Sequence, residues 1–218
     1  MSIDPRTVPQ PELRSAIAEE RVALADDLAG LTDDEWRAPS LCTGWTVHEV
    51  VAHVSQSGFP HTWAWIAAAI RHGGPDGGED VRTRARAARH TPAELVEQLR
   101  ASASSTYRLP LSNRWDPYVD LLVHGQDALR PLGRTHPVPT RLLAPALTFA
   151  WHSPLYGVRR RLRTVRFVAT DLDWSAGDGP LELHGPAGDL LLAVTGRPAG
   201  LAGLTGSGRE AAAATLGG

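Results

Sequence analysis

The chain has 218 residues, of which 42% are hydrophobic, and its formal net charge is −2. This composition is typical of a soluble globular protein with a sizeable core. The weak charge argues against nucleic acid or an anionic membrane surface as a partner. Cys42 is the single cysteine, which excludes an intrachain disulfide and a cysteine-rich zinc site.

The distribution of apolar residues predicts no signal peptide and no membrane span. The first residues lack the apolar run of a signal peptide, and no run approaches the roughly 20 residues of a membrane span. We therefore expect a soluble cytoplasmic protein, either a monomer or a homodimer.

Helical signals dominate the first part of the chain. Apolar periodicity and N-cap residues predict helices over residues 11–31, 46–71, 92–107 and 116–129. The first of these ends at Gly30, and Pro60 is expected to kink or break the second. Between them, 32–36 is predicted to be a short capped turn, and GGPDGG at 73–78 a flexible loop. Four helices in succession predict a bundle.

The pattern changes after the proline-rich segment 131–140. A helix is predicted over 141–162, interrupted at Pro154, followed by strands over 164–170 and 180–184. Further helices are predicted over 187–195 and within 201–216. The fold class is therefore mainly α, with a helical bundle in residues 1–135 and a small α+β domain in residues 136–218.

One metal-capable side chain lies on a well-defined helix. Thr46 and Glu49 match a capping box, and Val47, Val50, Val51 and Val54 recur at helical spacing as a buried stripe. His53 lies two turns into this helix at the edge of the stripe, where it is able to point between helices. His61 competes with it on an ideal helical wheel, whereas His48 is expected to be solvated.

The last bundle helix carries a second metal-capable pair. Asp120 and His124 are spaced i, i+4 and lie on one face, with Asp127 a further turn along. A carboxylate and an imidazole in this arrangement can hold one cation, and His53 is the best third ligand. The alternative is an exposed helix pair or a hydrogen-bonded core couple. Gly125 indicates close packing beside His124.

The two segments LTDDEWRAPSLCTGWTVHEVVAHV and VDLLVHGQDALRPLG resemble the mycothiol-dependent maleylpyruvate isomerase family. These proteins are actinobacterial members of the DinB-like metal-binding four-helix bundles. The segment DLDWSAGDGPLELHGPAGDLLLAVTGRPAGLAGLTG resembles the small, sterol-carrier-like C-terminal domain of the same family. The resemblance covers most of the chain in the right order.

The resemblance implies a zinc site and a thiol cosubstrate. The histidine that ends the W-x-V-x-x-x-x-x-H run is a zinc ligand in the family and corresponds to His53. A Glu-x-x-x-His pair supplies the other ligands and corresponds to Asp120 and His124, with aspartate in place of glutamate. Mycothiol, held as a thiolate by the metal, adds to the double bond of maleylpyruvate, and rotation and elimination give fumarylpyruvate. Transfer of the thiol to another electrophile is a second reaction of this type.

A carboxylate substrate also requires a cationic contact. We expect Arg197, in the segment TGRP, to face the cleft between the domains as a catalytic residue, although a surface arginine at a helix end fits the same pattern. The arginines of RRRLR at 159–163 form either a basic patch or a solvated helix face. Cys42 is either a low-pKa thiol or, more simply, a packed side chain.

A rival interpretation is a non-catalytic metal-binding or small apolar ligand-binding module. The apolar run 190–194 then lines a ligand pocket, although such a run is more often simply core. The two interpretations differ in one respect: a binding module for apolar ligands tolerates the loss of His53 and His124, and the enzyme does not.

Overall fold

The computed structural model describes residues 4–110 and 112–217. The chain divides into two compact units, one formed by Arg14–His136 and the other by the remaining described residues. We call them the helical unit and the mixed unit. The predicted division into domains at residues 135 and 136 stays a prediction.

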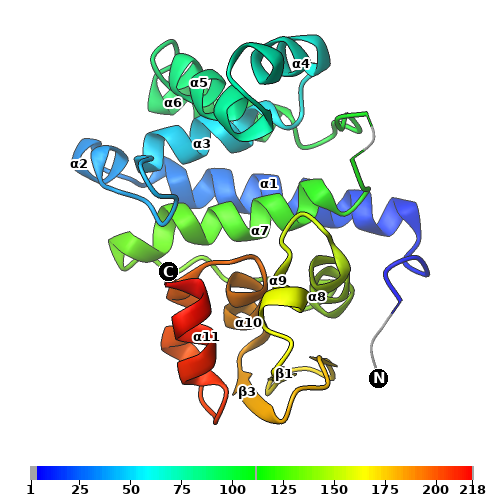
Figure 1. Cartoon of the computed structure of the whole chain (residues 1–218). Coiled ribbons are helices and arrows are strands. Elements are labelled where there is room, and N and C mark those ends of the chain that lie inside the picture. Colours follow the sequence, from blue (N-terminus) through cyan, green and yellow to red (C-terminus); the bar gives the residue numbers. More distant parts are fainter. Residues whose placement is uncertain (1–3, 111, 218) are drawn as a thin grey trace. The chain divides into compact units, whose positions relative to one another are not determined.

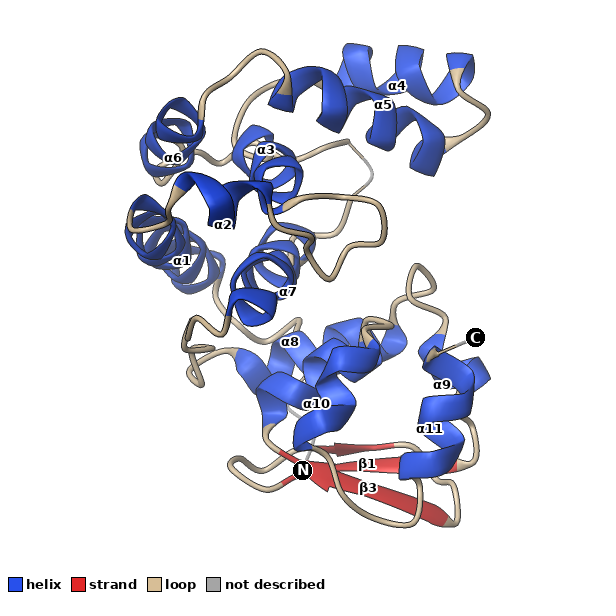
Figure 2. Ribbon diagram, turned by 90° about the vertical axis from the view of Figure 1, so that its left-hand side faces the viewer, coloured by secondary structure: helices blue, strands red, loops and turns tan. Residues whose placement is uncertain are grey.

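The helical unit is built on a four-helix bundle. The four helices are α1 (Gln10–Ala29), α3 (Val47–Gln56), α6 (Pro92–Ala101) and α7 (Asp116–Leu129). Figure 1 shows α1 and α7 running side by side, and Figure 2 shows the four helices close to end-on. Apolar side chains from each helix fill the space between them: Leu24, Leu28, Val50, Val54, Leu95, Leu99, Val119 and Leu122. The predicted bundle is confirmed.

Capping boxes fix where three of the helices begin. At α3, the Thr46 hydroxyl accepts a hydrogen bond from the Glu49 N–H, and the Glu49 carboxylate accepts one from the Thr46 N–H at 2.7 Å. The same reciprocal pattern opens α2 (Asp33–Arg37), which the sequence predicted only as a capped turn, and α6, where proline follows the N-cap. Helix α7 begins at Asp116 as predicted.

Helix α5 (Pro75–Ala87) corrects the sequence prediction, because the segment 73–78 is not a flexible loop. Gly73 and Gly74 form the turn with positive φ, and Pro75 begins the helix. A Cβ on Gly78 would lie 2.6 Å from the backbone N of Ala69, so this glycine lets α5 pack directly on α4 (Thr62–Arg71). The glycines therefore serve a turn and a close helix contact.

Two predicted helices are shorter than expected. The helix over 46–71 is broken at Pro60 into α3 and α4, the outcome that proline favours. The helix from Pro92 ends at Ala101, and its predicted last turns are irregular chain. A short 3₁₀ turn, η1 (Arg130–Leu132), closes α7.

The mixed unit contains a three-stranded sheet and short helices. Strand β1 (Val165–Ala169) is central, with β2 (Ser175–Ala176) antiparallel on one side and β3 (Leu181–Gly185) parallel on the other. The helical elements of this unit are α8 (Leu143–His152), α9 (Val158–Arg161), α10 (Ala187–Val194), η2 (Pro198–Gly203) and α11 (Arg209–Leu216). The run 190–194 is buried throughout and belongs to the core of this unit.

The predicted class, mainly α with a bundle and a small α+β part, is confirmed. Among the described residues, no helix combines the length and the hydropathy that a membrane crossing requires.

Candidate metal centre

His53 projects from the middle of α3 toward α7. Its Nδ1 lies 2.9 Å from Oε1 of Glu79 on α5, and its Nε2 lies 3.7 Å from Oδ1 of Asp120 on α7. Because a carboxylate only accepts hydrogen bonds, Nδ1 carries the proton that is donated to Glu79. The helix start at Thr46 and the contact with Glu79 together fix which ring nitrogen of His53 faces Asp120.

Asp120 and His124 face the same space from α7. Oδ1 of Asp120 lies 3.3 Å from Nε2 of His124, and Nδ1 of His124 donates to Oδ2 of Asp127 at 2.9 Å. The His53 and His124 rings are 4.9 Å apart between centroids, at 71°. In both imidazoles, Nδ1 thus donates a hydrogen bond to a carboxylate, and Nε2 faces the same oxygen of Asp120. Carboxylates hold metal-binding histidines in this way.

The spacing of these donors fits a divalent metal. Ligands at about 2.0–2.1 Å from a tetrahedral zinc are separated from one another by roughly 3.3–3.4 Å. The two nitrogen-to-oxygen separations at Asp120, 3.3 and 3.7 Å, are close to this value. Two neutral imidazole nitrogens and one carboxylate oxygen also form a donor set that zinc favours. Asp120, although shorter than the glutamate that the resemblance implies, therefore lies within ligand spacing of both imidazoles.

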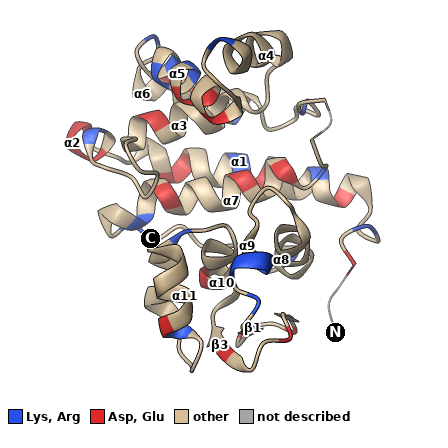
Figure 3. Cartoon of the chain, viewed as in Figure 1, with Lys and Arg blue, Asp and Glu red and all other residues tan. Residues whose placement is uncertain are grey.

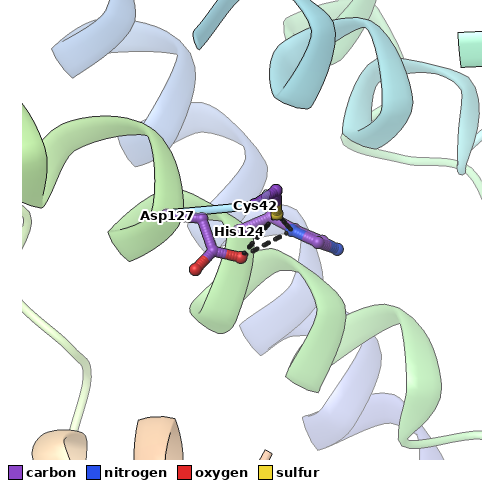
Figure 4. Close-up of side chains that lie close together, drawn as sticks. All are labelled: Cys42, His124 and Asp127. Atoms are coloured by element: carbon purple, nitrogen blue, oxygen red, sulfur yellow. Dashed lines mark hydrogen bonds and ion pairs between the residues drawn. The ribbon is translucent and has the colours of Figure 1, made fainter. Parts of the chain in front are cut away.

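A second set of donors lies beside the first and shares His124. Sγ of Cys42 lies 3.1 Å from Oδ2 of Asp127 and 3.6 Å from Nδ1 of His124, as Figure 4 shows. A metal in this set would replace the proton that His124 gives to Asp127. The Asp127 side chain is 0% exposed, whereas that of Asp120 is 33% exposed, so Asp120 is the more accessible carboxylate of the two sets. We therefore favour His53, Asp120 and His124.

Comparison with known proteins bears on this centre. The sequence pattern of the mycothiol maleylpyruvate isomerase N-terminal domain family matches residues 17–129, more than half of the chain. The chain belongs to this family. The matched region contains all the residues of both donor sets.

Two solved structures share the fold over nearly the whole chain. The crystal structure of the mycothiol-dependent maleylpyruvate isomerase matches with a TM-score of 0.65 at 14% identity, over 94% of this chain and 95% of that chain. The structure of a histidine-to-alanine mutant of that isomerase matches with the same TM-score and coverage at 13% identity. No curated protein matches the sequence.

The ionisable groups of this centre shift one another's pKa values. Burial by itself raises the pKa of Asp120, but the two imidazoles outweigh that effect and hold the pKa far below its usual range. Burial lowers the pKa of His124, but Asp120 and Asp127 outweigh it and raise the pKa well above its usual value. The pKa of His53 is raised in the same way by Asp120 and Glu79. A cation that bound here would have to displace protons from both imidazoles, so its binding would strengthen as pH rises.

The contact between His53 and Glu79 was missed in the sequence. Glu79 also accepts a hydrogen bond from Nε2 of Gln56 at 2.6 Å, and Oε1 of Gln56 accepts one from Arg82 at 2.8 Å. These hydrogen bonds connect α5 to the face of α3 that carries His53. Pro75 at a first helical position was the available signal for α5, and the surrounding glycines obscured it.

The other residues considered from the sequence lie outside the donor set. His61 precedes α4 and donates to the Phe59 carbonyl. His48 was expected to be solvated but is only partly exposed, and its Nε2 donates to the His90 carbonyl. Arg197 lies between α10 and η2 in the mixed unit, where its guanidinium donates to the Thr195 carbonyl at 2.8 Å. Its role toward a substrate stays a prediction.

Proposed function

We propose that the chain is a metal-dependent and mycothiol-dependent enzyme of the maleylpyruvate isomerase type. In this proposal, His53, Asp120 and His124 hold one divalent metal, most simply zinc. The observation that carries it is the shared geometry of the two imidazoles, each with Nδ1 on a carboxylate and Nε2 directed at Oδ1 of Asp120. Family membership supports the same conclusion.

The metal would supply a Lewis acid that holds a thiol in its thiolate form near neutral pH. The chain's own residues prepare that step. Glu79 and Asp127 accept hydrogen bonds from the Nδ1 atoms of His53 and His124, which leaves the Nε2 lone pairs for the cation. The partial exposure of Asp120 leaves a path for the thiol. Cys42 does not serve as the nucleophile in this proposal, because its thiol donates to the buried Asp127. An external thiol is therefore required.

The electrophile with which the thiolate reacts determines whether the reaction is an isomerisation or an S-transfer. Addition of sulfur to the activated double bond of a cis-enedioate substrate leaves a single bond, about which the substrate rotates. Elimination of the same thiolate restores the double bond in the trans form, with no net change of atoms. With a substrate that carries a leaving group, the thiol stays attached, and the reaction is an S-transfer. The cytoplasm, where low-molecular-weight thiols stay reduced, is the compartment that this chemistry requires.

Arg197 is proposed as the residue that binds the substrate carboxylate. Its planar guanidinium is able to form two parallel hydrogen bonds with a carboxylate, which a lysine cannot do. We expect Arg197→Lys to raise KM for the substrate more than it lowers kcat. An unchanged KM with loss of kcat would contradict a binding role.

The test follows maleylpyruvate by absorbance, with and without mycothiol, using the zinc-loaded protein. The proposal predicts isomerisation that requires the thiol and is lost in His124→Ala. A rate that does not depend on the thiol contradicts it. Loss of free thiol with a chlorinated arene, without isomerisation, assigns the S-transfer reaction instead. The apolar binding module has no comparable support, because the run 190–194 is core.

A further inference from the structure

A cavity of about 700 Å³ lies within the mixed unit, and none of the residues of the metal centre lines it. Its buried lining includes Trp151 on α8 and Trp174 just before β2, which are 6% and 2% exposed. Nε1 of Trp174 donates to the Thr148 hydroxyl at 3.1 Å, so this polar atom is already satisfied. The two indoles are therefore almost wholly covered, and the accessible lining is more polar than apolar, in a cavity of the size that holds small molecules.

Three arginines line the same cavity from consecutive elements. Arg159 is on α9, Arg163 follows α9, and Arg166 is on β1; all three are exposed. In Figure 3, the ribbon of α9 is coloured blue because its residues 159–161 are arginines. Over the described residues, no carboxylate lies within ion-pair distance of Arg159 or Arg163. Arg166 has a loose contact of 3.6 Å with the half-exposed Glu182. These guanidinium groups therefore retain most of their capacity to bind an anion.

Two glycines hold one wall of the cavity close to β1. Gly177 has φ of +87°, and a Cβ there would lie 2.5 Å from the carbonyl oxygen of Val165. A Cβ on Gly179 would lie 2.0 Å from the carbonyl carbon of Thr164. Asp178, the one acidic residue among those lining the cavity, stands between them. The wall is thus a fixed part of the fold, and positive charge exceeds negative charge in the lining.

We propose that this cavity binds a small organic dianion, bearing either two carboxylates or a phosphate ester. Guanidinium groups bind both kinds of oxyanion through paired, charge-assisted hydrogen bonds. A neutral ligand would leave the arginines unpaired, and an inorganic anion would fill only a small part of the cavity. This site is additional to the proposed enzymatic function and depends on none of its residues.

Isothermal titration calorimetry on the full chain at low salt tests the proposal. The probes are phthalate for the dicarboxylate class, phenyl phosphate for the phosphate class, and dimethyl phthalate as the neutral counterpart. The variant is the double substitution Arg159→Gln with Arg163→Gln. Its matched control is Arg160→Gln, because Arg160 is an exposed arginine of the same helix that does not line the cavity. His124→Ala separates this site from the metal centre.

We expect saturable binding of at least one dianion and none of dimethyl phthalate. The double variant should bind at least about tenfold more weakly, and the Arg160→Gln and His124→Ala proteins should bind as the wild type does. The dianion that binds more tightly identifies the chemical class of the ligand.

Three results overturn the proposal. They are no saturable binding of either dianion up to about 10 mM, equal weakening in the double variant and in Arg160→Gln, and binding that disappears in His124→Ala. The second result indicates only general attraction by surface charge, and the third assigns the anion to the metal centre.

Discussion

Glu79 offers the sharpest test of how the metal centre is held. Its carboxylate accepts hydrogen bonds from Nδ1 of His53 at 2.9 Å and from Nε2 of Gln56 at 2.6 Å. In Glu79→Ala, the His53 ring loses the partner that fixes its orientation and proton. Loss of such a partner weakens metal binding by about 10- to 100-fold, or about 1.4–2.7 kcal/mol. The Glu79 side chain is 19% exposed, so water replaces part of the lost contact. We expect a loss of about 30-fold, in the middle of that range.

The assay is competition for zinc between the metal-free protein and a chromophoric chelator at constant pH. Glu79→Gln keeps an oxygen acceptor but removes the charge, so its affinity should lie between the wild type and Glu79→Ala. Asp76→Ala is the matched control, because Asp76 is an exposed carboxylate at the start of the same helix. It should bind zinc as tightly as the wild type.

Two results would refute the role of Glu79. One is a Glu79→Ala affinity within about twofold of the wild type, which would mean that the contact does not orient the ligand. The other is an equal loss in Asp76→Ala, which would show that any change in the charge of α5 has the same effect. Circular dichroism of each variant excludes unfolding as the cause.

Three further predictions follow from the same geometry. In the chelator assay, Asp120→Asn should weaken zinc binding by about 100-fold or more, while Asp120→Glu should stay within about tenfold of the wild type; equal losses would contradict a ligand role. Cys42→Ser should retain one metal per chain by elemental analysis, and loss of the metal would assign it to the neighbouring donor set. His136 bridges Glu20 at 2.8 Å and Asp27 at 2.6 Å; burial lowers its pKa, but these carboxylates outweigh burial and raise it. The stabilisation by the protonated ring is therefore complete below about pH 6.5 and lost as pH rises through the folded-state pKa, so His136→Gln should cost about 3 kcal/mol at pH 6 and less at pH 9. Urea unfolding measures this difference, and an equal cost at both pH values would contradict it.

Local rules explain why the donor set could be predicted from the sequence. The capping box at Thr46 determines where α3 begins, and this determines which face of the helix carries His53. Asp120 and His124 need no tertiary information to be neighbours, because i, i+4 residues on one helix always are. That His53 lies beside this pair followed from the family resemblance and from the expected bundle.

The residues that hold the donor set were not predictable by the same rules. Glu79 reaches His53 only because α5 packs on α3 and α4, a contact that depends on the small size of Gly78. Gly125 was expected to mark a crowded site at His124, but a Cβ there would meet the His136 ring at 3.0 Å. His136 comes from the segment that follows α7, and no local sequence pattern predicts that this segment packs against Gly125.

The cavity of the mixed unit was missed for a related reason. The segment RRRLR has the pattern of a solvated helix face, and its exposed arginines agree with that pattern. One wall of the cavity is made by β2, only two residues long, and by the loop that contains Gly177 and Gly179. A strand this short gives no alternating pattern in the sequence. The sequence therefore did not show that a wall of the cavity lies near the arginines.

Metal content tests the central claim most directly. Elemental analysis of the untagged protein, purified without chelators, should find close to one zinc per chain, and His124→Ala should have lost it. A wild-type protein that holds no metal, even after zinc is added back and the excess is dialysed away, would contradict the assignment of His53, Asp120 and His124 as ligands.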